Sequence, residues 1–123
     1  MKKIVKYRKY EILLIDLEPV KSSIQAGTRP CLVIQTNLVN EYSPNLIVIP
    51  FTTNTKKIFS GEIMIKPSDT NGLSSLSKLL SYQIVTVNKN SIIKKMGLLE
   101  ESFRKELLRS LDIVLDREDE FEI

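Results

Sequence analysis

An arginine and a threonine, 23 positions apart, are the residues of this chain best placed to do chemistry together. Two apolar runs, residues 31–36 and 46–51, predict strands that pair as an antiparallel hairpin. In the symmetric register Arg29 lies opposite Thr52, with Cβ atoms about 4.5–5.5 Å apart. Pro30 disfavours helical backbone at the preceding residue, so Arg29 should stand extended where the loop meets the strand.

A guanidinium held beside a hydroxyl is suited to binding a phosphate, because the guanidinium is always charged and donates several hydrogen bonds. The plainer interpretation is a surface arginine before a strand and a β-favouring threonine at a strand end. Spacing alone favours this plainer interpretation. Gln25 and Gln83 are similarly ambiguous, since glutamines cap loops or face solvent more often than they bind a base.

The elements that must position these residues are short. The pattern of apolar and turn-forming residues predicts strands over 11–17, 31–36, 46–51, 62–65 and 77–87, turn residues over 37–45, a short helical turn over 91–96, and an amphipathic helix over 99–115. Five short strands followed by one helix favour an α+β fold, a small SH3-like antiparallel β-barrel with the C-terminal helix packed on it. We expect the tail, residues 116–123, to be frayed.

The amino-acid composition excludes several kinds of catalytic and metal-binding site. With 123 residues and 14.1 kDa the chain makes one domain, residues 1–123. It has no histidine and a single cysteine, Cys31, which excludes an internal disulfide, a zinc finger and a Ser-His-Asp site. No apolar run approaches the roughly 20 residues that span a bilayer, so we expect a cytoplasmic protein without membrane contact.

Charge is unevenly distributed along the chain. Residues 1–95 hold 14 Lys and Arg against 6 Asp and Glu, whereas residues 96–123 hold 4 against 9. A basic body suggests a surface for a polyanion, because clustered Lys and Arg release counterions from phosphates. A solvated basic surface with an acidic tail explains the same counts equally well.

A longer pattern surrounds the hairpin. The run Gln-Ala-Gly-Thr-Arg-Pro-Cys-Leu-Val-Ile-Gln over 25–35 is followed by Asn40, Ser43-Pro44 and Ile-Val-Ile-Pro-Phe-Thr over 47–52. A strand over 80–87 then carries Gln-Ile and Thr-Val in the spacing Gln-Ile-x-Thr-Val. In this order the blocks resemble the MazF/PemK (Kid) family of toxin endoribonucleases, and the resemblance covers roughly residues 7–115.

The resemblance implies a homodimeric, SH3-like ribonuclease that cuts single-stranded RNA, usually mRNA, without a metal or other cofactor and is inhibited by a cognate antitoxin protein. By position, Arg29 and Thr52 match the family's catalytic pair. Gln25, Ser77 and Gln83 match positions that bind RNA, and Thr53, next to the matched threonine, is a weaker RNA-binding candidate. The RNA 2′-hydroxyl is an internal nucleophile, so we expect 2′,3′-cyclic phosphate and 5′-hydroxyl ends.

Several positions depart from the family's pattern, and one is the first strand, which reads Lys9-Tyr10-Glu11 where the family has Arg-Gly-Asp. Ile24 and Tyr82 replace acidic residues, and Val85 replaces an arginine. These changes leave the catalytic pair intact and predict a changed cut site. The alternative is an inactive chain, or a toxin of the same fold that acts by protein contact, as CcdB-like toxins act on DNA gyrase. The Arg29-Pro30 block with Thr52 favours the RNA-cleaving branch.

Overall fold

The structure is a computed structural model that describes residues 6–17, 27–56 and 62–117. The described residues form seven strands, two α-helices and one 3-10 turn. In chain order these are β1 (Glu11–Asp16), β2 (Thr28–Val33), α1 (Asn37–Asn40), β3 (Asn45–Thr52), β4 (Ile63–Ile65), β5 (Ser77–Leu79), β6 (Val85–Asn88), the 3-10 turn η1 (Lys89–Ser91), β7 (Ile92–Leu98) and α2 (Glu101–Leu115).

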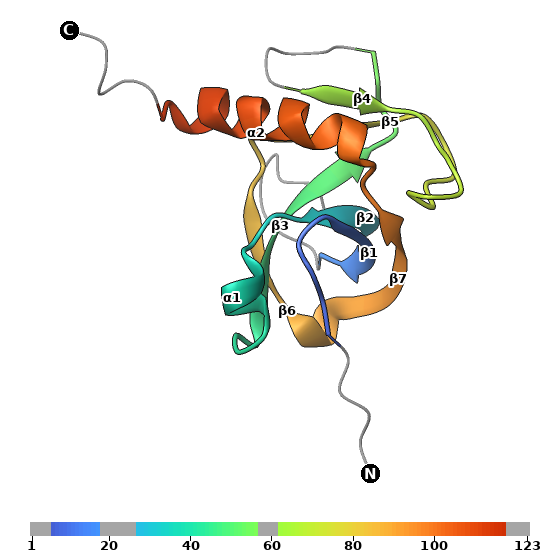
Figure 1. The fold of residues 1–123 in the computed structure, drawn as a ribbon. Helices are drawn as coiled ribbons and strands as arrows, with labels where there is room; N and C mark the ends of the chain where they lie inside the picture. The colour runs from blue at the N-terminus through green and yellow to red at the C-terminus, as the bar shows by residue number, and fades with distance from the viewer. Residues whose placement is uncertain (1–5, 18–26, 57–61, 118–123) are drawn as a thin grey trace, which may run out of the picture.

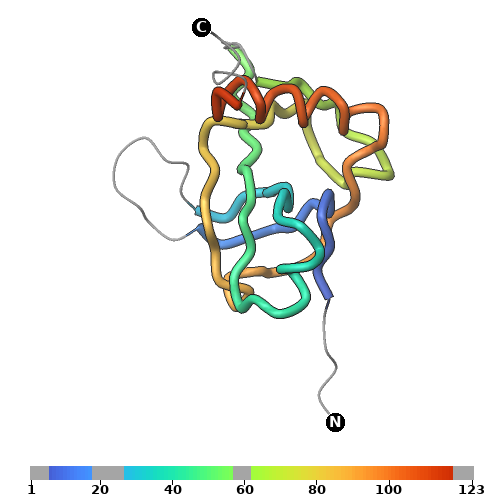
Figure 2. Tube along the Cα trace, turned by 60° about the vertical axis from the view of Figure 1, so that its left-hand side comes forward, coloured from blue at the N-terminus to red at the C-terminus, as the bar shows by residue number. Residues whose placement is uncertain are grey.

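The strands form one antiparallel sheet with the order β4-β5-β3-β2-β1-β7, and β6 pairs with β3 beside β5. The sheet curls round instead of lying flat, and α2 runs across its upper side in both views (Figure 1, Figure 2). A curved antiparallel sheet with one C-terminal helix confirms the predicted α+β class.

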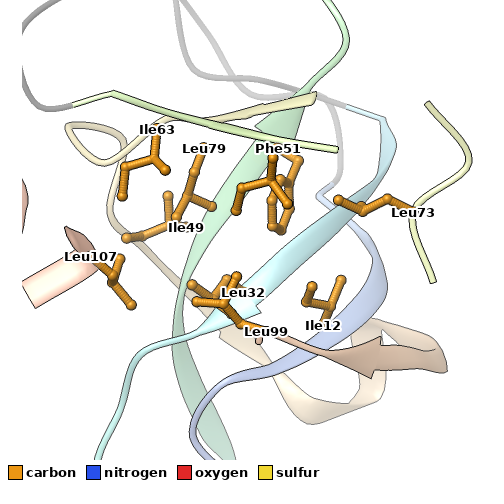
Figure 3. Packing of buried hydrophobic residues seen from close by; sticks show 10 residues of the cluster. Ile12, Leu32, Ile49, Phe51, Ile63, Leu73, Leu79, Leu99 and Leu107 are labelled. Atoms are coloured by element: carbon orange, nitrogen blue, oxygen red, sulfur yellow. The ribbon is translucent and has the colours of Figure 1, made fainter. Parts of the chain in front are cut away.

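Apolar side chains alternate along the central strands between two buried clusters. The cluster next to α2, called here the helix-side cluster, contains Ile12, Leu32, Ile49, Phe51, Ile63, Ile65, Leu73, Leu79, Leu99 and Leu107 (Figure 3). The cluster on the other face, called here the inner cluster, contains Leu13, Ile15, Leu17, Cys31, Val33, Leu46, Val48 and Val87. A one-residue slip would exchange the two sets, so burial fixes the strand register.

Helix α2 is the element that the sequence predicts best. Leu107 is fully buried, and Phe103 and Leu111 pack against the helix-side cluster at helical spacing. Arg104 fastens the start of the helix, since its guanidinium donates to the carbonyl of Leu99 at 3.1 and 3.2 Å. The predicted tail lies mostly outside the described residues, which end at 117.

Two predictions for the second half of the chain need correction. The single patchy strand predicted over 77–87 is two strands, β5 and β6, separated by a turn that the Gln83 N–H closes on the Leu80 carbonyl. The helical turn predicted over 91–96 is wrong, because the 3-10 turn covers Lys89–Ser91 and shares only Ser91 with that range, and residues 92–96 belong to strand β7. Its β-branched Ile92 pairs with β1, and backbone pairing there outweighs the local turn signal.

The hairpin connection also differs from a plain turn. The Thr36 hydroxyl accepts the Leu38 N–H at 3.4 Å and caps the one-turn helix α1. Strand β2 begins at Thr28, three residues before the predicted start, so Arg29 lies inside the strand and not at its junction. No helix among residues 6–17, 27–56 and 62–117 has the length and apolar character to cross a membrane.

The connection between β4 and β5 is tied to the start of α2. Fully buried Asn71 donates to the Glu100 carboxylate at 3.2 Å, and the Ser68 hydroxyl donates to the same carboxylate at 3.0 Å. Gly97 lies against this loop, where an added Cβ would overlap the backbone of Thr70 and Asn71.

Candidate active site

The β2–β3 hairpin has the predicted register. Cys31 lies opposite Pro50, and Leu32 and Val33 lie opposite Ile49 and Val48 in the same frame. The β2–β3 pairing ends at Cys31 and Pro50, and the same frame continued by two residues on each strand would set Arg29 opposite Thr52. Because Cys31 and Val48 belong to the inner cluster, both Arg29 and Thr52 lie on the inner face of the sheet.

Arg29 is half-buried near the start of β2 and lies opposite Ile15 of β1. Its positive charge acts on the thiol of Cys31, the next residue of β2 on the same face. Burial raises the pKa of the Cys31 thiol to about 12, and the Arg29 guanidinium opposes that rise. The thiol therefore stays neutral at pH 7, which makes Cys31 a poor nucleophile and leaves Arg29 as the charged group of this pair.

Thr52 is the last residue of β3 and only 7% exposed. Its hydroxyl oxygen accepts the Asn54 N–H at 3.2 Å. A threonine hydroxyl has one proton to donate besides the lone pairs that accept. The contact with Asn54 orients the oxygen and leaves that proton free for a ligand at the end of the strand.

A charged residue, Lys78, lies beside Thr52 and forms an ion pair with Glu62. Lys78 of β5 is the register partner of Thr52, and its ammonium lies 3.1 Å from the carboxylate of Glu62. Both side chains are buried, with 8% and 0% exposure. Phe51 and Leu79, the neighbouring pair in the same register, enter the helix-side cluster, so Thr52 and Lys78 project to the opposite, inner face.

With the β2–β3 frame continued to its end, three residues form a row across neighbouring strands: Arg29 on β2, Thr52 on β3 and Lys78 on β5. The row places a hydroxyl between two cationic side chains. Such a set of donors can bind an anion and stabilise negative charge that develops on it.

The other predicted site residues are distributed around this row. Ser77 is buried, and its hydroxyl donates to the Ser75 carbonyl at 2.9 Å. Thr53 is exposed directly after Thr52, and Gln83 is half-buried in the turn between β5 and β6. Gln25 lies outside the described residues. The structure thus brings Arg29, Thr52 and Thr53 to one end of the sheet.

The turn between β5 and β6 lies along the edge of β3 with which both of these strands pair. The Leu80 N–H donates to the Pro50 carbonyl at 3.0 Å, which fixes the turn two residues from Thr52. Tyr82, 49% exposed, and Ile84 stand out from it. An exposed aromatic ring beside an anion site can stack on a nucleobase.

The structure also has a groove away from this row of residues. Its volume is about 750 Å³, it runs between α2 and β4, and it is lined by Glu62, Ile63, Ser102, Lys105, Glu106, Arg109, Ser110 and Ile113. Neither Arg29 nor Thr52 lines it. Within the described ranges, no three His, Cys, Asp or Glu side chains gather closely enough to hold a metal ion.

Sequence reasoning missed Lys78 and Glu62. A single lysine inside the apolar run 76–80 was the signal for Lys78, because a lysine there is buried only when paired. Its partner Glu62 is 16 positions away and could be found only once the β4–β5 pairing was known.

Comparison with known proteins finds a matching family and related chains. A model of the family described as PemK-like, MazF-like toxin of type II toxin-antitoxin system matches residues 8–115. The endoribonuclease MazF of Staphylococcus saprophyticus subsp. saprophyticus is 35% identical over 109 residues, which make up 88% of this chain and 90% of that relative.

Solved structures share the fold. A MazF from Deinococcus radiodurans has a TM-score of 0.77 at 18% identity, over 92% of this chain and 99% of that one. An endoribonuclease from a mycobacterial species, solved in complex with its cognate antitoxin, has a TM-score of 0.73 at 18% identity, over 89% of this chain and 95% of that one. At such identities the likeness supports the arrangement of the strands and α2.

Proposed function

Because the chain belongs to the family of PemK-like, MazF-like toxins of type II toxin–antitoxin systems, we propose that it is an endoribonuclease that cleaves single-stranded RNA, with mRNA as its substrate, at the Arg29–Thr52 site. The observation that supports the proposal is the hairpin register at Cys31–Val33, whose continuation would bring the Arg29 guanidinium opposite the Thr52 hydroxyl that Asn54 orients. The family relation supplies the class of substrate.

In the proposed reaction the 2′-hydroxyl of the RNA attacks the adjacent phosphorus, so the protein needs no nucleophile of its own. The 2′-hydroxyl gives up its proton as its new bond to phosphorus forms, the P–O bond to the 5′ oxygen of the next nucleotide breaks, and that oxygen takes up a proton, so one proton is released and one is taken up. Arg29 neutralises the charge that develops on the phosphoryl oxygens, and Thr52 donates a hydrogen bond to one of them. The products are a 2′,3′-cyclic phosphate and a 5′-hydroxyl.

RNA recognition is assigned to the residues around this pair. Gln25, Ser77, Gln83 and Thr53 are the proposed RNA-binding residues. Tyr82 stands on the exposed turn where the family has an acidic residue, so the base read at that position should differ.

Two partners complete the proposal. A cognate antitoxin should inhibit the protein, as the mycobacterial complex with its antitoxin suggests for a relative. A homodimer is supported by apolar side chains that α2 leaves half-exposed, Leu108, Ile113 and Leu115. The cytoplasm, where mRNA is found, is the expected compartment.

The test is incubation of the purified protein with a mixed single-stranded RNA in the presence of EDTA. Discrete fragments that carry 5′-hydroxyl ends support the proposal. A 2′-deoxy nucleotide on the 5′ side of a cut site should block cleavage there, because the nucleophile is gone. Intact RNA at high protein concentration would contradict it and favour a toxin that acts by protein contact.

A further inference from the structure

The ion pair between Lys78 and Glu62 is the most deeply buried ion pair in the described part of the chain. The Arg29–Thr52 chemistry does not use it. Its two side chains are 8% and 0% exposed, whereas the pair of Lys95 and Glu11, on the opposite edge of the sheet, is 44% and 16% exposed. Taking both charges out of water is costly, and an apolar pair of similar volume often serves stability as well or better. A role besides stability would account for the charges.

The position of the pair suggests that role. Lys78 is the register partner of Thr52, so the Cβ atoms of these two residues lie about 4.5–5.5 Å apart on the inner face. Glu62 directly precedes β4, which is one strand farther from Thr52 in the order β4-β5-β3-β2 (Figure 1). The positive member of the pair therefore belongs to the strand next to the hydroxyl, and the negative member belongs to the edge strand.

Given the proposed function, on which this inference rests, we propose that Lys78 is a positioning residue of the active site: its ammonium, held by Glu62, supplies a second positive charge that draws the scissile phosphate toward Thr52. Arg29 acts from β2 on one side of the hydroxyl, and Lys78 acts from β5 on the other. Glu62 fixes the ammonium, because a lysine side chain is flexible and a buried partner limits its positions.

Pairing with Glu62 allows the Lys78 ammonium to be buried and still act on Thr52. Burying a lone ammonium costs more free energy than burying an ion pair, so Glu62 offsets part of the cost of burying Lys78. The field of the pair does not vanish at Thr52, because the cation lies on the nearer strand and the two charges cancel only in part. The expected contribution to the rate is about tenfold, smaller than that of a donor that touches the phosphate.

The decisive variant exchanges the two charges, Lys78→Glu with Glu62→Lys. The exchange keeps an ion pair between β4 and β5 and the net charge of the chain, but it sets the negative group beside Thr52. A purely structural pair would tolerate this change. If Lys78 positions the phosphate, cleavage should fall about a hundredfold while thermal unfolding stays within a few degrees of wild type.

Affinity gives a readout that is independent of turnover. The probe is a short RNA that carries a 2′-deoxy nucleotide at its cut site, which binds but cannot be cut. The exchanged variant should bind this RNA at least severalfold more weakly than wild type, with a shallower dependence on salt. A merely structural pair would leave both quantities unchanged.

A second variant covers the case in which the exchanged pair does not fold. The apolar pair Lys78→Met with Glu62→Leu replaces both charges by side chains of similar volume, which buried sites commonly accept. Its cleavage rate should fall about tenfold with the fold intact. The matched control is the exchange of Lys95 and Glu11, an ion pair between β7 and β1, which should leave the rate unchanged.

Three outcomes decide the inference. A loss of rate and affinity in the Lys78–Glu62 variants, with the Lys95–Glu11 control unaffected, supports it. A wild-type rate in either folded variant of the Lys78–Glu62 pair overturns it and leaves the proposed ribonuclease intact. Wild-type protein that cuts no RNA overturns both, since no phosphate is then handled at Thr52.

Discussion

Two half-buried arginines in this protein should respond to truncation in opposite ways. Arg29 lies near the start of β2 on the inner face, and the β2–β3 register continued by two residues sets it opposite Thr52. Arg104 lies on α2, where it stacks on the Tyr10 ring, 4.4 Å from the ring centroid, and donates to the Leu99 carbonyl. We predict that Arg29→Ala removes activity and spares the fold, and that Arg104→Ala weakens the fold and spares activity.

The magnitudes follow from what each side chain touches. Loss of a donor that stabilises developing charge costs about 2.7–4 kcal/mol of transition-state stabilisation, a fall of roughly 10²–10³ in kcat for Arg29→Ala. Its stability should change by no more than about 1 kcal/mol, chiefly from lost packing of the side-chain stem. Arg104→Ala loses a charged hydrogen bond worth about 1.5–3 kcal/mol and a cation–π contact worth about 0.5–1 kcal/mol.

The assay combines two measurements on each variant. Initial cleavage rates are followed on a short fluorescent RNA at 25 °C, where both variants should stay folded, and stability is followed by thermal unfolding in circular dichroism. The expected result is a rate loss without a stability loss for Arg29→Ala and the reverse for Arg104→Ala. If Arg29→Ala cleaves within threefold of wild type, the guanidinium has no role in the reaction and the site assignment is wrong.

Three further predictions follow from single contacts. Thr52→Val should lower kcat by about 10²-fold while Thr52→Ser keeps most of it, because only serine retains the hydroxyl that Asn54 orients; equal rates in single-turnover cleavage would refute this. Gly97→Ala should destabilise the protein by about 2–4 kcal/mol in urea unfolding, since its Cβ would overlap the Thr70 backbone, and an unchanged midpoint would contradict that packing. For Cys31, whose folded pKa is raised from 9.0 to about 12, the neutral thiol costs nothing below pH 9 and stability should fall as pH rises from 9 to 12; Cys31→Val should remove that part of the fall in urea titrations.

The sequence is most informative where burial decides the structure. The hairpin register could be predicted because Leu32, Val33 and their partners alternate between two apolar clusters, and a slip would expose one set. The alignment of Arg29 with Thr52 follows from that register. The helix α2 was predictable for the same reason, since its apolar residues recur at helical spacing.

Prediction fails where backbone pairing overrides local pattern. Strand β7 has Lys94 and Lys95 exposed in succession and Gly97 near its end, so its residues show no alternation. It exists because it pairs with β1, with two irregularities in register. The pairing of Lys78 with Glu62 could not be predicted from the sequence for a related reason. Two isolated charged residues form no pattern until β4 and β5 are known to be neighbours.

Thr52, the proposed reacting group on β3, lies apart from the turn that carries the proposed RNA-binding residue Gln83. Strand β3 pairs with β6 over its first half and with β5 at Phe51 and Thr52, so β5 and β6 must part beside Ile49 and Pro50. The parting creates the exposed turn that carries Tyr82.

Core residues fix the hydroxyl, because Ile49 and Phe51 are buried in the helix-side cluster and set the face on which Thr52 lies. No comparable burial holds Tyr82, whose side chain is half exposed on the turn. Substitutions on such a turn cost little stability, whereas a shift of β3 by one residue would turn Thr52 into the core. A fold built this way can change the RNA sequence it reads at the turn while the phosphate chemistry on the strands stays in place.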